Sequence, residues 1–335
     1  MKENYLLKEN LDKYEEIKEN SKKIKYFPSP NIGGKFYASL LIIFIFFITT
    51  FKEEKLKFNK VCLCAIAKEE NRYIREFVEY YKNYDIDKIY IFDNNDKDGE
   101  KFEDVIDDYI KNGFVELIDY KEIPQPQLKS YNDCYKRFNS SYDWLIFFDI
   151  DEFIYLKDFT SFKSFLNDKR FDRCNRVQFN WIFYTDNNQL YYENKPVRER
   201  FTEKQLYARG KKRGGEQGIK SVLRGNIKNL KITCPHALSA NTRSCDGFGK
   251  PQKVSGISTK YSDFEYYYLE HYACKSTEEF IINKLKKTDV YHTKDINMEK
   301  IKVYFGYNEI TKEKIDLIER ETKYNLSIYR NQIAG

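Results

Sequence analysis

The apolar positions between residues 60 and 150 follow two different periods. Four continuous apolar runs predict buried strands at 61–67, 88–92, 114–118 and 144–148. Between them, apolar residues spaced three and four apart predict amphipathic helices at 74–81, 102–110 and 128–138. Because strands and helices alternate, we expect an α/β fold whose mostly parallel, Rossmann-like sheet carries helices on both faces.

After residue 155 the apolar runs become shorter and less regular. They predict strands at 176–183, 219–224 and 264–269 and amphipathic helices at 277–287 and 312–320. A loop rich in Gly, Lys and Arg occupies 210–218. We therefore predict one domain over 60–290, followed by a helical extension over 291–335.

The N-terminal segment predicts a polar tail and a membrane anchor. Residues 1–35 are rich in Lys and Glu, and residues 36–51 form an uncharged apolar run. This run is shorter than the roughly 20 residues that span a hydrocarbon core, so a buried core helix is the alternative to a single-pass anchor. Its unbroken apolarity favours the anchor, and the lysines before it place the N-terminus in the cytoplasm and the domain on the far side. A Golgi-type membrane and a bacterial inner membrane both fit.

Charge and cysteine content exclude some classes of function. The chain has 58 basic and 52 acidic side chains and a formal net charge of +6, spread along its length. This balance provides no basic block for nucleic acid, while a modest positive excess suits an anionic small ligand. The seven cysteines include no CxxC pair, so we expect neither a disulfide scaffold nor a structural zinc. Cys62 and Cys64 share one face of the first predicted strand, where we expect buried free thiols.

Three carboxylates follow the apolar run at 144–148: Asp149, Asp151 and Glu152. In an extended chain, residues i and i+2 point to the same side, so Asp149 and Asp151 can converge on one divalent cation. Mg²⁺ or Mn²⁺ bound by carboxylates suits a diphosphate ligand, because the metal bridges protein and phosphate oxygens. The alternative is that these acids cap the following turn. Their position after the fourth strand favours the metal, since ligands bind beyond the carboxyl ends of such strands.

Several ordered motifs together resemble a known family. They are AIAKEEN at 65–71, REFVEYY at 75–81, IYIFDNN at 89–95, WLIFFDIDEF at 144–153, Cys234-Pro235-His236 and HYACKSTEEF at 271–280. Over about residues 60 to 290 the chain is similar to the family 2 and family 92 glycosyltransferases, including the group once called domain of unknown function 23. The resemblance implies a GT-A fold, a nucleotide-diphosphate sugar donor, a divalent metal (Mn²⁺ or Mg²⁺) and usually inversion at the anomeric carbon. We expect a UDP-sugar as donor and a glycan, lipid or protein-linked acceptor.

The resemblance also suggests roles for individual residues near the donor. Asp149 and Asp151 match the metal-binding motif, while the loop with Ala67 and Glu70 and the loop with Asp93 match the positions that embrace the nucleoside. A carboxylate such as Asp93 can accept hydrogen bonds from ribose hydroxyls or a base N–H. A turn-forming Asp is the alternative.

Two histidines and two lysines complete the candidate donor site. His236 and His271 fall in the matched downstream segments, where either can supply a third metal ligand, contact the diphosphate or simply pack. Lys220 and Lys275 can neutralise phosphate as the leaving group departs, or be ordinary solvated lysines.

The expected reaction is a single displacement in which a general base deprotonates an acceptor hydroxyl while the metal stabilises the departing diphosphate. Glu152, beside the metal pair, and Glu216, in the 210–218 loop, are the candidate bases. For Glu152 the alternative is a role in orienting the metal pair. The loop with Glu216 could close over the donor.

Other functions fit the pattern less well. A nucleotidyltransferase needs a glycine-rich phosphate loop after the first strand, and residues 67–71 contain no glycine. A haloacid-dehalogenase-like phosphatase carries its paired acids on the first strand, whereas here they follow the fourth. The non-enzymatic alternative is a membrane-tethered module that binds glycans or nucleotide sugars without turnover.

Overall fold

The computed structural model describes residues 60–124, 126–206, 217–239, 242–252, 258–259, 263–286 and 296–333. Phe58–Gly335 form one compact unit. Among the residues just given, no helix is long and apolar enough to cross a membrane. The predicted tail at 1–35, the predicted anchor at 36–51 and Glu216 lie outside these ranges and stay predictions, as do the domain boundaries.

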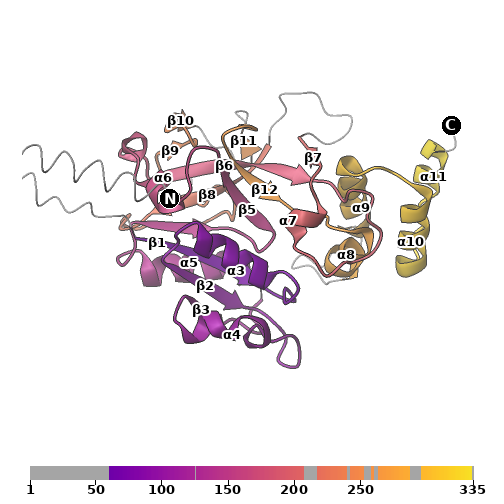
Figure 1. The fold of residues 1–335 in the computed structure, drawn as a ribbon, viewed down its shortest axis with the longest axis horizontal. Helices are drawn as coiled ribbons and strands as arrows, with labels where there is room; N and C mark the ends of the chain where they lie inside the picture. Colours follow the sequence, from indigo (N-terminus) through magenta and orange to yellow (C-terminus); the bar gives the residue numbers. More distant parts are fainter. Residues whose placement is uncertain are drawn as a thin grey trace, which may run out of the picture. The chain divides into compact units, whose positions relative to one another are not determined.

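Four parallel strands form one half of the main sheet, in the order β3-β2-β1-β4. Figure 1 shows the first three of them side by side. Their bounds are β1 Val61–Ala67, β2 Lys88–Asp93, β3 Val115–Asp119 and β4 Trp144–Phe147. The helices between them are α3 Ile74–Asn83, α4 Glu103–Lys111 and α5 Pro126–Phe138. These seven elements confirm the predicted order.

Helices cover both faces of this half of the sheet, because successive strand residues point to opposite sides. On β1, Leu63 and Ala65 belong to the same buried cluster as Phe77 of α3. Cys64, which lies between them in the strand, points to the opposite face of the sheet and belongs to a second buried cluster with Tyr131 of α5. The two-faced arrangement is the one that the α/β pattern predicted.

The other half of the main sheet is mixed, with antiparallel pairs except for β6 and β9, which are parallel. β8 Gln217–Arg224 lies between β4 and β6 Arg176–Tyr184 and pairs with both, and β9 Ser244–Cys245 and β10 Pro251–Gln252 follow beyond β6. A smaller sheet joins β5 Glu152–Leu156, β12 Tyr267–His271 and β6. Two short strands, β7 Lys204–Gln205 and β11 Ser258–Thr259, pair with β6 and β8. The predicted α/β fold class is confirmed.

One strand starts later than the sequence predicted. A strand was expected at 264–269, but β12 begins at Tyr267. The Asp263 carboxylate accepts hydrogen bonds from the backbone N–H groups of Glu265, Tyr266 and Tyr267. These bonds fold residues 263–266 into a turn, so the apolar residues of this segment lie outside strand β12.

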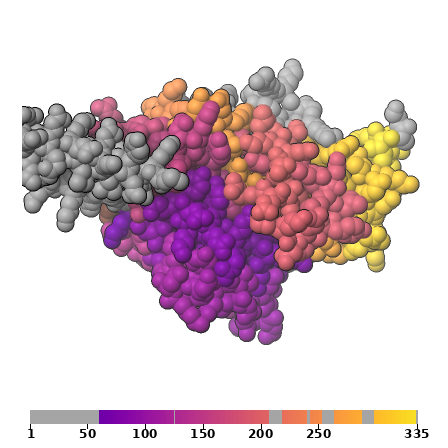
Figure 2. Space-filling model, viewed as in Figure 1, coloured from indigo at the N-terminus to yellow at the C-terminus, as the bar shows by residue number. Residues whose placement is uncertain are grey.

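Short helices close one end of the domain. α8 Thr277–Phe280 starts at a capping box of Ser276 and Glu279 and continues into the π-helix η2 Ile281–Lys286, so the helix predicted at 277–287 changes its winding. α9 Ile296–Tyr307, α10 Lys312–Thr322 and α11 Ser327–Ile333 share a separate apolar cluster with them. A buried ion pair joins Lys314 of α10 to Asp186 just after β6 (Nζ–Oδ2 2.7 Å). Figure 2 shows these helices beside the segment that follows β6.

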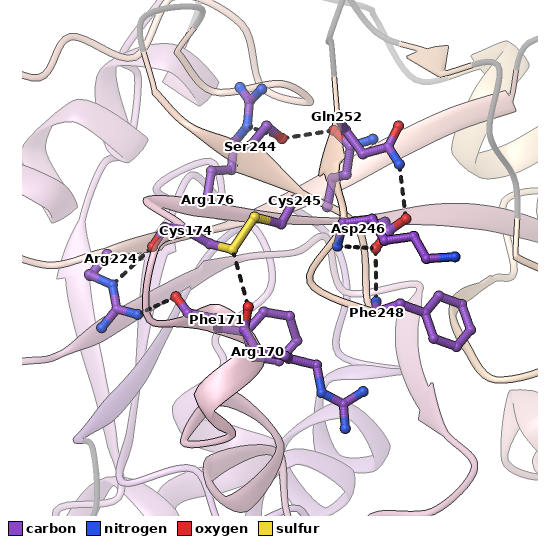
Figure 3. Close-up of a disulfide and its surroundings, with 12 residues drawn as sticks. Arg170, Phe171, Cys174, Arg176, Arg224, Ser244, Cys245, Asp246, Phe248 and Gln252 are labelled. Atoms are coloured by element: carbon purple, nitrogen blue, oxygen red, sulfur yellow. Dashed lines mark hydrogen bonds between the residues drawn. A yellow bond between two sulfur atoms is a disulfide. The ribbon is translucent and has the colours of Figure 1, made fainter.

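Two disulfides overturn the expectation that the chain would have no disulfide scaffold. Cys174, which follows the 3-10 helix η1 Lys169–Phe171, is bonded to Cys245 of β9 (Figure 3). Cys64 of β1 is bonded to Cys134 of α5. The partners are 71 and 70 residues apart in the sequence, so only the fold brings them together. Three cysteines are free thiols, and the first of them is buried as predicted: Cys62, Cys234 and Cys274.

Candidate functional site

A cavity of about 760 Å³ lies at the carboxyl ends of the strands. Ala67 at the end of β1, Asn94 after β2, Asp149 and Asp151 after β4, and His271 at the end of β12 all line it. This is the edge of an α/β sheet at which ligands bind, because the strand ends and the loops after them leave room there.

Asp149 is held from behind by a buried lysine. Lys220 of β8 has no exposed side-chain surface, and its Nζ lies 2.8 Å from Asp149 Oδ2. Tyr131 donates a hydrogen bond to Asp149 Oδ1 at 3.0 Å. Burial alone would raise the pKa of Asp149, but the Lys220 ammonium outweighs it and lowers that pKa. Lys220 does not line the cavity, so the structure places it as a support for Asp149, out of the position predicted for a phosphate contact.

Glu152 lies beneath the same turn. Its side chain is fully buried, Oε2 accepts the Asp149 backbone N–H at 2.9 Å, and Lys220 Nζ lies 3.6 Å from Oε2. Glu152 Oε1 has no hydrogen-bond partner in the described part of the chain. Burial raises the pKa of Glu152 well above its usual value. Because Glu152 fixes the Asp149 turn and does not line the cavity, its position favours the orienting role over that of general base.

Asp151 faces three basic side chains at the cavity wall. His271 Nε2 lies 3.7 Å from Oδ1, and Nζ of Lys275 and Nζ of Lys284 each lie 3.9 Å from Oδ2. Burial alone would raise the pKa of Asp151, but these neighbours lower it below its usual value. Burial lowers the pKa of His271 to about 4, so its imidazole is neutral at neutral pH. A neutral imidazole is the form that can bind a metal.

The second candidate histidine lies behind an aromatic wall. His236 packs against the Trp181 ring with centroids 5.1 Å apart, and its Nδ1 lies 3.3 Å from the Ile219 carbonyl oxygen. Trp181 lines the cavity between His236 and His271, whereas His236 does not line it. The structure therefore places His271 beside the paired acids, whereas the Trp181 ring separates His236 from His271.

Of the three residues predicted to contact the nucleoside, two line the cavity and one does not. Ala67 and Glu70 line the cavity. Asp93 is buried, accepts the backbone N–H of Asn95 at 3.0 Å and lies 3.4 Å from Lys121 Nζ, and it is absent from the cavity wall. Asp93 thus has the contacts of a turn-forming residue, and the neighbouring Asn94 lines the cavity in its place.

Lys275 reaches the cavity from a tight turn after β12. Its backbone is left-handed (φ 53°), a conformation that costs a non-glycine residue roughly 1–3 kcal/mol and persists only where neighbours fix it. Here the next residues do so: Ser276 caps α8, and Glu279 pairs with the Arg200 guanidinium through two contacts of 2.8 Å. The Glu279–Arg200 pair is buried and joins α8 to α7 Val197–Arg200. This anchor holds Lys275 beside Asp151.

Three residues of the site had no signal in the sequence. Lys284 and Asn283 line the cavity from η2, and Tyr131 bonds to Asp149 from α5. Lys284 and Asn283 belong to an ordinary amphipathic pattern, and Tyr131 is one of 29 tyrosines. Only the contacts made in the folded chain distinguish them.

The donor atoms fit a divalent metal bound together with a phosphate. Across the described ranges, no cluster of three or more His, Cys, Asp or Glu side chains is arranged to hold a metal ion. Mg²⁺ needs fewer protein ligands than that, because it is usually bound by one or two carboxylates together with water and substrate phosphates. Asp149 and Asp151 provide two such carboxylates at the cavity, with neutral His271 beside them.

The family model described as "Glycosyltransferase family 92" matches residues 58–319. The chain belongs to glycosyltransferase family 92. A family 92 protein of Oryza sativa subsp. japonica is 27% identical over 108 residues, which are 31% of this chain and 18% of that protein. A family 92 protein of Ricinus communis is 30% identical over 98 residues, 29% of this chain and 16% of its own length. The family 92 chain thus matches less than a fifth of the length of these relatives.

Solved structures with a related arrangement are distant from this family 92 chain. S. aureus TarS 1-349 in complex with UDP-GlcNAc has a TM-score of 0.37 and 12% identity, covering 78% of this chain and 79% of that one. GalNAc-T7 with UDP, GalNAc and Mn²⁺ has a TM-score of 0.28 and 10% identity, covering 39% and 24%. At these TM-scores nothing about the site of this chain follows from the likeness.

Proposed function

We propose that this family 92 chain is a metal-dependent glycosyltransferase that moves a sugar from a nucleotide-diphosphate sugar to a hydroxyl of a glycan, lipid or protein-linked acceptor, with inversion. A UDP-sugar is the expected donor. One observation supports this above the others: Asp149 and Asp151 line a strand-end cavity together with Lys275 and Lys284. Each of these two ammonium groups lies 3.9 Å from the Asp151 carboxylate.

In this proposal, different cavity residues bind the metal, the diphosphate and the nucleoside. Asp149 and Asp151 would hold Mn²⁺ or Mg²⁺, which when bound supplies positive charge to the diphosphate. Lys275 and Lys284 neutralise the phosphate oxygens as the sugar departs, because their ammonium groups already face Asp151. The loops with Ala67, Glu70 and Asn94 border the end of the cavity at β1 and β2, which suits the nucleoside.

The general base comes from outside the metal turn in this proposal. Glu152 is buried and bonded to the Asp149 backbone, so it positions the carboxylates and does not reach an acceptor. Glu216, outside the described residues, remains the candidate base. A Glu216→Gln variant that keeps donor binding and loses transfer would support this assignment, and one with full transfer would refute it.

Residues 36–51 are proposed to anchor the chain in a membrane as a single pass, with the domain on the side away from the cytoplasm. The two disulfides support that side, because disulfides persist in oxidising compartments. Protease added to sealed membranes tests the topology. The domain is expected to resist digestion in sealed vesicles that keep the cytoplasmic side outward, and its degradation there would refute the proposed orientation.

The deciding experiment is a donor screen with the full chain in detergent. UDP-, GDP- and CMP-sugars are incubated with Mn²⁺ or with EDTA, and nucleotide release is measured. One donor is expected to be consumed only with metal, and Asp151→Asn is expected to lower kcat/KM by about 100-fold or more, because a preorganised charge contact in a transition state is worth that much. Asp107→Asn, on the exposed side of α4, is the matched control. Nucleotide binding without turnover under every condition would favour the non-catalytic binding module.

A further inference from the structure

Trp181 is the one tryptophan, tyrosine or phenylalanine side chain among the described residues that line the cavity. The other described lining residues are aliphatic, polar or charged, apart from the imidazole of His271. A single large aromatic ring in this cavity needs an explanation, since burying an indole elsewhere in the core would remove more apolar area from water.

Packing on several sides fixes the orientation of this ring. His271 and His236 lie against it with centroids 4.5 and 5.1 Å away, and Phe183 lies 5.9 Å away on the same strand face. Gly218 of the neighbouring strand β8 lies against it, where an added Cβ would lie 2.2 Å from Trp181 Cε3. A glycine in a strand interior often marks such a close approach. Trp181 Nε1 has no hydrogen-bond partner among the described residues, so packing alone sets the ring's position.

The order of strands in the sheet says which part of a donor could reach Trp181. A nucleotide sugar is linear: nucleoside, diphosphate, sugar. The sheet order is β2-β1-β4-β8-β6, with the nucleoside end of the cavity at β1 and β2, the paired acids after β4, and Trp181 on β6. Neighbouring strands lie about 4.8 Å apart, so Trp181 is roughly 10 Å beyond β4, on the side away from the nucleoside.

We propose that Trp181 is a specificity-determining residue whose ring packs against the hexose of the donor, holding its anomeric carbon near Asp151. This inference rests on the proposed function and adds a residue to it. The C–H groups of a hexose ring carry partial positive charge and pack well on the negative face of an indole. Gly218 belongs to the same arrangement, because any larger residue there forces the Trp181 ring out of its position.

The test compares ligands with and without the hexose. The full chain binds UDP, UDP-glucose, UDP-galactose or UDP-N-acetylglucosamine in a calorimeter with Mn²⁺ present. For Trp181→Ala we expect the Kd for UDP to change by less than about twofold, while the Kd for the best UDP-hexose rises about 10-fold, which corresponds to about 1.4 kcal/mol. Trp181→Phe keeps an aromatic face and should stay within about threefold of the natural chain. Gly218→Ala should weaken the UDP-hexose and leave UDP unchanged.

The outcomes separate the two proposals. If UDP and the UDP-hexose weaken equally in Trp181→Ala, the ring only supports the fold, and the inference is wrong. If neither weakens, the hexose does not touch the ring, and the inference is wrong while the proposed function stands. If the natural chain binds no nucleotide of the UDP, GDP or CMP series with any metal, the proposed function fails and this inference fails with it.

Discussion

Replacing Lys220 by methionine would remove the ammonium group that lies between two carboxylates under the cavity. Methionine keeps most of the side-chain volume, so the change is electrostatic more than steric. Lys220 Nζ lies 2.8 Å from Asp149 Oδ2 and 3.6 Å from Glu152 Oε2, and Lys220 and Glu152 have no exposed side-chain surface. The variant therefore leaves the buried Glu152 and the partly exposed Asp149 without their shared cation.

The cost follows from these distances. With an effective dielectric constant of 20, the attraction is about 6 kcal/mol at the shorter distance and about 5 kcal/mol at the longer one. The variant no longer has to desolvate an ammonium group, which offsets much of this sum. Removing one partner of a buried ion pair typically costs about 3–5 kcal/mol of unfolding free energy, and we expect a loss in that range for Lys220→Met.

The loss should depend on pH. The Lys220 ammonium holds the pKa of Asp149 below its usual value and opposes the rise in the pKa of Glu152. Without it both carboxyl pKa values rise, so the folded state binds more protons than the unfolded state above about pH 4.3. Stability then falls as pH increases, and the deficit is larger at pH 8 than at pH 5.

Urea unfolding with EDTA present measures this directly at both pH values. Lys302→Met, at an exposed position of α9, is the matched control and should not move the urea midpoint. A loss below about 1 kcal/mol in Lys220→Met would refute the reasoning, because it would mean that the two acids do not need the ammonium. A loss of equal size at pH 5 and pH 8 would refute the part assigned to Asp149 and Glu152.

Three further predictions concern the scaffold and the metal. Replacing Cys174 and Cys245 together by alanine removes a bond between positions 71 apart in the sequence and should lower the unfolding free energy, measured in urea, by about 4 kcal/mol. An unchanged urea midpoint would show that the bond does not constrain the unfolded chain. The pKa of Glu279 is lowered to about 2, because its contacts with Arg200 outweigh burial. Its contribution to the unfolding free energy is therefore present at neutral pH and is lost as pH falls from about 4.5 toward 2. Glu279→Gln should thus be less stable at pH 7 and show a flatter acid limb in a series of melting curves; an unaltered acid limb would contradict this assignment. His271→Ala should weaken Mn²⁺ binding at least about 10-fold in titration calorimetry with UDP present, and an unchanged affinity would leave the two aspartates as the only protein ligands.

The parallel half of the sheet could be predicted because β1, β2 and β4 are buried on both faces. β1 and β4 carry almost continuous apolar residues, and α3 shows its buried face at helical spacing. β5 could not be predicted in this way, since it begins at the buried acid Glu152 directly after the paired aspartates. The π-helical winding of η2 could not be predicted from the sequence either, because the same amphipathic spacing suits an α-helix and a π-helix.

The candidate site could be located but not assembled from the sequence. Asp149 and Asp151 were predicted because acids at the end of an apolar strand have to face solvent or a ligand. The partner of Asp149 is Lys220, 71 residues away in the chain, and nothing in a Lys-rich sequence distinguishes it from other lysines. The disulfides were missed for the same reason, since cysteines 70 and 71 residues apart have no recognisable spacing.

The Cys174–Cys245 bond also affects how the integrity of a preparation can be judged. The bond joins two cysteines that are 71 positions apart, and the chain between them includes all of β6, β7 and β8. A proteolytic cut anywhere between those cysteines leaves both fragments covalently attached. The nicked protein would migrate as one band on a denaturing gel without reductant and as two bands after reduction. A loss of activity in an apparently intact preparation should therefore be checked on a reducing gel before any residue is held responsible.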